Sequence, residues 1–153
     1  MKAVIQRVTD ASVSVDNIVK GSIKSGLLVY LGVAHNDSEK DACWLAEKTV
    51  NLRIFNDTEG KMNLSLREII AAGEPAGILS ISQFTLLADA RKGRRPSWNG
   101  AALPQTAKKL YEYFNNKIKE QEIICESGEF QAHMKVTYTN DGPVTILLDS
   151  KEI

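Results

Sequence analysis

The sequence predicts an α+β fold built on an antiparallel sheet. Segments with strand patterns outnumber segments with helix patterns, and they cluster along the chain instead of alternating with helices. The length of 153 residues and a hydrophobic content of 43% suit a single domain, residues 1–153, because two halves would each have a thin core. The same composition excludes intrinsic disorder, and two cysteines exclude a disulfide scaffold.

The N-terminal third contains strand patterns separated by turn signals. Residues 3–5 open one strand, residues 12–16 alternate between apolar and polar side chains, and residues 27–33 form an apolar run. The turn signals are Asp16-Asn17 and Lys24-Ser25-Gly26, which are typical of hairpin connections. We therefore expect neighbouring antiparallel strands in this part of the chain.

Two helices and further strands are expected in the rest of the chain. Ser38 as N-cap with Asp41 at the capping-box position predicts the start of the first helix. Pro104 suits the first turn of the second helix, which carries one apolar stripe. The other expected elements are strands at 52–55, 78–84, 134–139 and 144–148, a loop at 88–103, and a turn at 140–143 that joins the last two strands.

Charge is balanced over the whole chain but not locally. Nineteen basic and nineteen acidic residues give a net charge of zero, which argues against a protein that coats nucleic acid through a general positive field. Arg91-Lys92-Gly93-Arg94-Arg95 nevertheless places four cations in five residues. This segment is either a solvated loop or a phosphate contact with Trp98 nearby for stacking.

Several kinds of site have no sequence support. Nucleotide-binding glycine motifs and a Gly-x-Ser-x-Gly elbow are missing, and His35 and His133 are the only histidines. Cys43 and Cys125 lack the paired spacing of zinc ligands, so we expect no metal and no cofactor. Catalysis, if present, must rest on backbone donors, hydroxyls and groups of the substrate. We also expect no membrane segment and no signal peptide, and hence a cytoplasmic protein.

Two polar segments occur where strands are expected to end. Ser82-Gln83-Phe84-Thr85-Leu86 leaves an apolar strand, a position where sites are commonly built, although its hydroxyls could simply terminate the strand. Asn140-Asp141-Gly142-Pro143-Val144-Thr145 reads as a hairpin turn, but a proline that enters a strand belongs at an edge or a site.

Together these two segments resemble the signature pair of the D-aminoacyl-tRNA deacylases, also called D-tyrosyl-tRNA deacylases. The resemblance covers essentially the whole chain, because further segments match in order: residues 4–8 with 11–13, then 26–29, 53–55, 60–63 and 92–97. One departure is Gln131, where the family has a small residue. The resemblance implies a small barrel-like β fold with helices on one side, and a homodimer that acts on aminoacyl-tRNA without a metal or other cofactor.

The resemblance also implies an activity and roles for individual residues. The family hydrolyses the ester between a D-amino acid, or glycine, and the 3′-terminal adenosine of tRNA, with help from the ribose 2′-hydroxyl. The backbone N–H of Phe84 is then the oxyanion donor, Gln83 orients the substrate, and Thr85 places a hydroxyl near the carbonyl; a nucleophilic Thr85 is the alternative. The remaining implied residues are Ser82, Met134, Asn140, Gly142, Pro143, Val144 and Thr145 for substrate, and Lys92, Arg94 and Arg95 for tRNA phosphates.

Discrimination between D and L esters is expected to work by exclusion. Both esters carry identical groups, so a rigid wall in the space of an L side chain is the better device. The resemblance implies that Gly142-Pro143 is this wall, with a cis peptide bond, inserted into the pocket of the partner subunit. Two other functions stay open on the residues alone: a non-catalytic RNA-binding module and a purely structural dimer.

Overall fold

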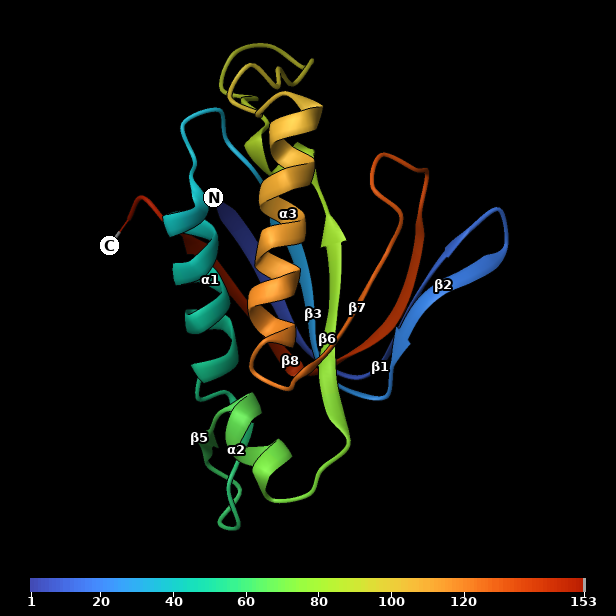
Figure 1. Ribbon diagram of the computed structural model, residues 1–153, viewed down its shortest axis with the longest axis vertical. Coiled ribbons are helices and arrows are strands. Elements are labelled where there is room, and N and C mark those ends of the chain that lie inside the picture. Colours follow the sequence, from blue (N-terminus) through green and yellow to red (C-terminus); the bar gives the residue numbers. More distant parts are fainter. Residues whose placement is uncertain (153) are drawn as a thin grey trace.

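The computed structural model describes residues 1–152 and has a six-stranded sheet at its centre (Figure 1). The strands are β1 (Lys2–Val15), β2 (Ile18–Ile23), β3 (Ser25–Gly32), β6 (Ala76–Ser82), β7 (Ile124–Ser127) and β8 (Lys135–Asp149). Their order is β2-β1-β3-β6-β7, and β8 pairs with the other edge of β1. The sheet curves into a nearly closed barrel, so the predicted α+β, barrel-like class is confirmed.

The prediction of a purely antiparallel sheet is wrong. The pairs β3–β6 and β6–β7 are parallel, whereas the pairs that involve β1 are antiparallel. Parallel neighbours need a long crossover, and here each crossover contains a helix: α1 (Glu39–Asn51) after β3 and α3 (Pro104–Lys119) after β6. The four-residue strand β7 carries too little pattern to reveal the second crossover from sequence.

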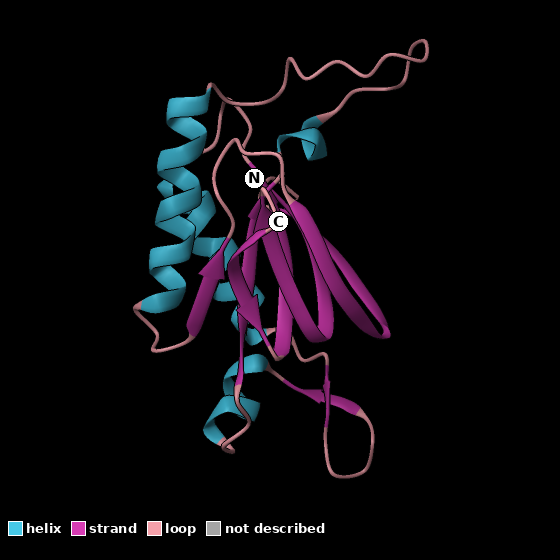
Figure 2. Cartoon of the chain, turned by 90° about the vertical axis from the view of Figure 1, so that its right-hand side faces the viewer, coloured by secondary structure: helices cyan, strands magenta, loops and turns pink. Residues whose placement is uncertain are grey.

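The two long helices lie side by side on one face of the sheet (Figure 2). A third, short helix, α2 (Leu66–Ala71), lies at the end of the molecule opposite the loop of residues 88–103. A two-stranded ribbon of β4 (Phe55–Asn56) and β5 (Met62–Leu64) lies at the same end. Of the strand expected at 52–55, only Phe55 lies in a strand, as the first residue of β4. No helix within residues 1–152 has the length and apolarity needed to cross a membrane.

The start of α1 follows the capping-box prediction. The Asp41 carboxylate accepts hydrogen bonds from the backbone N–H and the hydroxyl of Ser38, at 2.8 and 2.7 Å. It also accepts from the hydroxyl of Ser150 at 2.8 Å and from the ammonium of Lys151 at 2.6 Å. Burial raises the pKa of Asp41, but the hydrogen bonds from Lys151, Ser38 and Ser150 outweigh burial and hold that pKa well below its usual range.

The last two expected strands are one continuous strand, β8. The predicted turn at 140–143 is a bulge, because the pairing with β1 shifts register between Gln6 and Val8 and again before Asp10. The side-chain amide of Asn140 donates to the carbonyls of Arg7 and Val144, each at 3.0 Å. These bonds span the bulge, so the chain continues in the same direction instead of reversing.

Both faces of the central strands are buried. On one face, Leu27 and Ile78 pack against the helices, where Phe114 is fully buried; on the other, Leu28 and Leu79 fill the barrel interior. Burial on both faces explains why β3 and β6 read as nearly continuous apolar runs. The helix layer and the barrel interior meet where β6 ends, which is where the candidate site lies.

Candidate functional site

A cavity of about 510 Å³ opens where β6 ends. Its walls come from the end of β6, the start of α3, residues 101–102 and residues 130–136. Of the residues implied by the resemblance, the structure brings Ser82, Gln83, Phe84 and Met134 together around this cavity. A concave, largely apolar space with a few polar groups is the usual form of a small-molecule site.

Backbone pairing continues past the last residue of β6 and fixes the next segment. The N–H of Gln83 donates to the carbonyl of Leu31 at 2.8 Å, and a 3₁₀ turn, η1 (Phe84–Leu87), follows directly. The first N–H groups of such a turn have no acceptor inside it, so the N–H of Phe84 is available to a bound oxyanion. The sheet therefore positions a backbone donor at the rim of the cavity.

The side chains of Gln83 and Thr85 form one polar unit. The amide of Gln83 donates to the hydroxyl oxygen of Thr85 at 2.5 Å. An oxygen that accepts this bond keeps its own proton available for donation, but it becomes a weaker nucleophile. Thr85 is exposed and does not line the cavity, so the unit presents a hydroxyl donor beside it. The arrangement favours a donor role for Thr85 over covalent catalysis.

An aromatic wall closes the inner end of the cavity. Tyr111 of α3 is buried and donates its hydroxyl to the carbonyl of Ser80 at 2.8 Å, and its ring lies 6.1 Å from that of Phe130. Burial raises the pKa of Tyr111, although hydrogen bonds oppose the shift. The phenol therefore stays neutral at physiological pH and cannot serve as a base.

Sequence reasoning missed most of the apolar lining, including Ala101, Ala107, Tyr111 and Phe130. These residues read as ordinary core positions, and only the tertiary fold joins them. The sequence did mark Gln131, because the family has a small residue at this position. Its φ is +65°, in the left-handed region that glycine adopts most easily. Together with Ala132 and His133, it lines the rim of the cavity.

The segment from Asn140 to Thr145 does not reach the cavity of its own chain. It lies on β8 against β1, where the side-chain amide of Gln6 donates to the hydroxyl of Thr145 at 3.1 Å and the buried Arg7 pairs with Asp141 at 2.8 Å. Arg7 also donates to the carbonyl of Ile54 at 2.7 Å. Gly142 and Pro143 are exposed, and the peptide bond between them is cis, as predicted.

The loop of residues 88–103 projects from the end of the barrel that holds the cavity (Figure 2). Asp89 and Ser97 pair through two backbone hydrogen bonds of 2.8 and 2.9 Å, so residues 90–96 form the tip of an arm. Arg91 binds Asp89 and thereby lowers the pKa of that carboxyl. The predicted phosphate contacts Lys92, Arg94 and Arg95 are exposed on this tip and do not line the cavity.

The side chains of residues 1–152 also bear on metal binding and thiol chemistry. These residues contain no group of three or more His, Cys, Asp or Glu side chains that could hold a metal ion. Burial raises the pKa of the Cys125 thiol to about 12, so this residue is an inert core thiol. The groups available for chemistry at the cavity are therefore backbone donors, the amide of Gln83, hydroxyls and the imidazole of His133.

The chain is similar to known proteins along nearly its whole length. Residues 4–149 match the family described as D-Tyr-tRNA(Tyr) deacylase. A D-aminoacyl-tRNA deacylase of Thermosipho melanesiensis is 57% identical over 154 residues, covering 100% of this chain and 99% of that protein. One from Thermotoga petrophila is 51% identical, with 100% and 99% coverage. A solved structure named c-Myc DNA Unwinding Element Binding Protein has a TM-score of 0.88 at 37% identity, covering 97% of this chain and 98% of its own.

Proposed function

The chain belongs to the D-Tyr-tRNA(Tyr) deacylase family and is a hydrolase of D-aminoacyl-tRNA, and we propose that the cavity at the end of β6 is its active site. One observation carries this assignment: Ser82, Gln83 and Phe84 line the cavity together with Met134 from a distant segment. The catalytic unit is a single domain of residues 1–153, whose last residue, Ile153, lies outside the described part of the chain.

Hydrolysis at this site relies on positioning and on oxyanion stabilisation. An aminoacyl ester is an activated acyl group, so a fixed donor and an oriented water are sufficient for attack on its carbonyl. The N–H of Phe84 stabilises the developing oxyanion, and Gln83 with its bonded Thr85 hydroxyl orients the ester and ribose. The ribose 2′-hydroxyl assists the attacking water, and no carboxylate of residues 1–152 lines the cavity to take that role. His133, at the rim, is the lining side chain that could compete as a base, and its replacement with Asn tests that role.

The surrounding segments supply the rest of the substrate site. Lys92, Arg94 and Arg95 contact tRNA phosphates, since they are exposed on an arm beside the cavity. The enzyme is a homodimer in which Gly142-Pro143 of one subunit enters the cavity of the other; the exposure of this segment and its distance from its own cavity support this arrangement. Its place of action is the cytoplasm, where charged tRNA is used.

Chirality is decided by exclusion. The backbone of Gly142-Pro143 occupies the space that an L side chain would need, while Asn140, Val144 and Thr145 hold that segment in shape. Glycyl-tRNA has no side chain to exclude and is hydrolysed as well. Rejection of L esters protects the substrates of protein synthesis.

Substitution of Thr85 separates the proposed chemistry from covalent catalysis. Thr85→Val keeps the shape but removes the hydroxyl, so single-turnover hydrolysis of D-aminoacyl-tRNA is expected to slow by about tenfold, the loss of one ordinary hydrogen bond. Thr85→Ser is the matched control and retains the rate. A loss to the uncatalysed rate, or a trapped acyl-enzyme on the native threonine, would establish a nucleophile and refute the proposed mechanism.

A second candidate function is non-catalytic binding of nucleic acid. The solved relative named as a DNA unwinding element binding protein favours it, at 37% identity over nearly the whole chain. The same single-turnover assay distinguishes the two functions, because a pure binder would leave the ester of D-aminoacyl-tRNA intact while still retaining the tRNA.

A further inference from the structure

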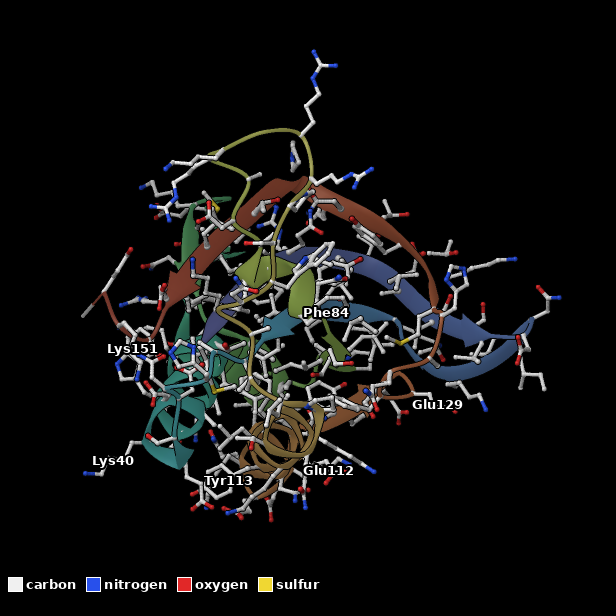
Figure 3. All side chains as sticks on the ribbon, turned by 90° about the horizontal axis from the view of Figure 1, so that it is seen from above. Lys40, Phe84, Glu112, Tyr113, Glu129 and Lys151 are labelled. Atoms are coloured by element: carbon white, nitrogen blue, oxygen red, sulfur yellow. The ribbon has the colours of Figure 1, made fainter. Side chains whose placement is uncertain are left out.

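The exposed ring of Phe84 lines the cavity and contacts a second exposed ring, that of Trp98, and the mechanism above uses neither ring. The side chains of Phe84 and Trp98 are 58% and 42% exposed, with ring centroids 5.7 Å apart and planes inclined at 60°. Figure 3 shows Phe84 near the middle of the molecule when it is viewed from the end that carries the arm. Neither ring is sheltered in the core, although both are large and apolar.

The backbone places Trp98 between the arm and the cavity. On the arm side it follows Ser97, which pairs with Asp89. On the cavity side the N–H of Ala101 donates to the carbonyl of Trp98 at 2.9 Å, and Ala101 itself lines the cavity. Backbone hydrogen bonds thus hold the chain on both sides of Trp98 and place this residue between the tip of the arm and the cavity.

Positively charged side chains lie on the arm beyond the aromatic pair. Arg91 is neutralised by Asp89, whereas Lys92, Arg94 and Arg95 form no ion pair with any other residue between 1 and 152. An aromatic surface followed by free cations is the arrangement that binds single-stranded nucleic acid, with bases on the rings and phosphates on the cations. The order outward is cavity, aromatic pair, cations.

We propose that Phe84 and Trp98 form a stacking platform for the nucleotide that precedes the terminal adenosine of the substrate. This inference rests on the proposed function, which places the aminoacyl ester in the cavity. A space of about 510 Å³ suits one small molecule, such as the aminoacylated terminus, and leaves the preceding nucleotides outside. The strand must leave across the rim, where the base meets the rings and its phosphate approaches the arm.

Two substrates, one with and one without the nucleotides that precede the terminal adenosine, test the inference. Trp98→Ala is expected to raise KM for D-aminoacyl-tRNA by about 5- to 150-fold, the range measured for loss of one stacked base, with kcat nearly unchanged. The same variant is expected to leave hydrolysis of 3′-O-D-aminoacyl-adenosine unchanged, because this substrate has no preceding nucleotide. Trp98→Phe is expected to restore most of the affinity, and Trp44→Phe on α1 is the control tryptophan.

Equal effects of Trp98→Ala on both substrates, or no effect on either, would overturn the inference. A binding measurement tests the stacking platform a second time, without depending on turnover. With Trp44→Phe as background, the uncharged ribotrinucleotide CCA is expected to quench Trp98 fluorescence, and adenosine alone is not; absence of quenching by CCA contradicts the platform. Failure of the native enzyme to hydrolyse either ester would refute the proposed function instead, and the quenching result would still decide the platform.

Discussion

Replacement of Gly142 by alanine tests whether the bulge in β8 is held as the structure shows. Gly142 has a φ of +119°, and a backbone conformation closed to most L residues costs roughly 1–3 kcal/mol. An added Cβ would lie 2.7 Å from Cγ2 and 3.0 Å from the backbone nitrogen of Val144, so overpacking adds roughly another 1–3 kcal/mol. Gly142→Ala is therefore expected to lower the free energy of unfolding by about 2–6 kcal/mol.

Gly73→Ala is the matched control for this substitution. Gly73 also has a positive φ, +97°, but no atom lies within 4 Å of an added Cβ, so only the conformational cost of roughly 1–3 kcal/mol is expected. Urea unfolding followed by circular dichroism measures both variants. At a temperature where both remain folded, Gly142→Ala is also expected to slow single-turnover deacylation, and Gly73→Ala is not. Equal stability and equal rates in the two variants would contradict the close packing of Gly142 against Val144.

Three further predictions concern catalysis, tRNA binding and pH. Replacing His35 and His133 together with Asn, or adding a chelator, should leave the single-turnover rate within a few-fold; a hundredfold loss, about 2.7 kcal/mol, would contradict catalysis by backbone and hydroxyl donors. Replacing Arg94 and Arg95 with Ala should flatten the slope of log affinity for tRNA against log salt by about 1.4–1.8, whereas an unchanged slope would place the tRNA elsewhere. The lowered pKa of Asp41 stabilises the fold above about pH 4, and this contribution is lost as the pH falls through the folded pKa. Asp41→Asn should therefore be less stable than the native protein in urea at pH 7 and closer to it at pH 3; an equal gap at both values would refute the assignment.

Local patterns predicted those parts of the fold that local interactions determine. The capping box of Ser38 and Asp41 and the first-turn Pro104 mark the starts of α1 and α3 because caps depend on neighbours in sequence. The parallel pairing of β3 with β6 could not be read in this way, since strand direction depends on a crossover that spans a whole helix. The turn expected at 140–143 failed for a similar reason: its continuity depends on Asn140, which bonds to Arg7 across the sheet.

The candidate site likewise combines residues that local sequence patterns reveal with residues that only tertiary packing brings together. The sequence singles out Ser82, Gln83 and Phe84 because they stand together at the end of an apolar strand, and the family resemblance implies their roles; the structure places all three at one cavity. Tyr111 and Phe130 were missed because each looks like a core aromatic within its own segment, and only packing brings them to one wall. Sequence thus identifies the polar edge of the site, whereas the shape of the cavity depends on tertiary contacts.

The most direct test of the account is the ratio of single-turnover hydrolysis rates for the D and L esters of one amino acid on the same tRNA. Exclusion by Gly142-Pro143 predicts rapid hydrolysis of the D ester, comparable hydrolysis of glycyl-tRNA, and an L ester that decays at its uncatalysed rate. Exclusion predicts that this ratio persists at saturating enzyme, because the L ester cannot reach a productive geometry. Hydrolysis of the L ester at a rate close to that of the D ester would contradict the account.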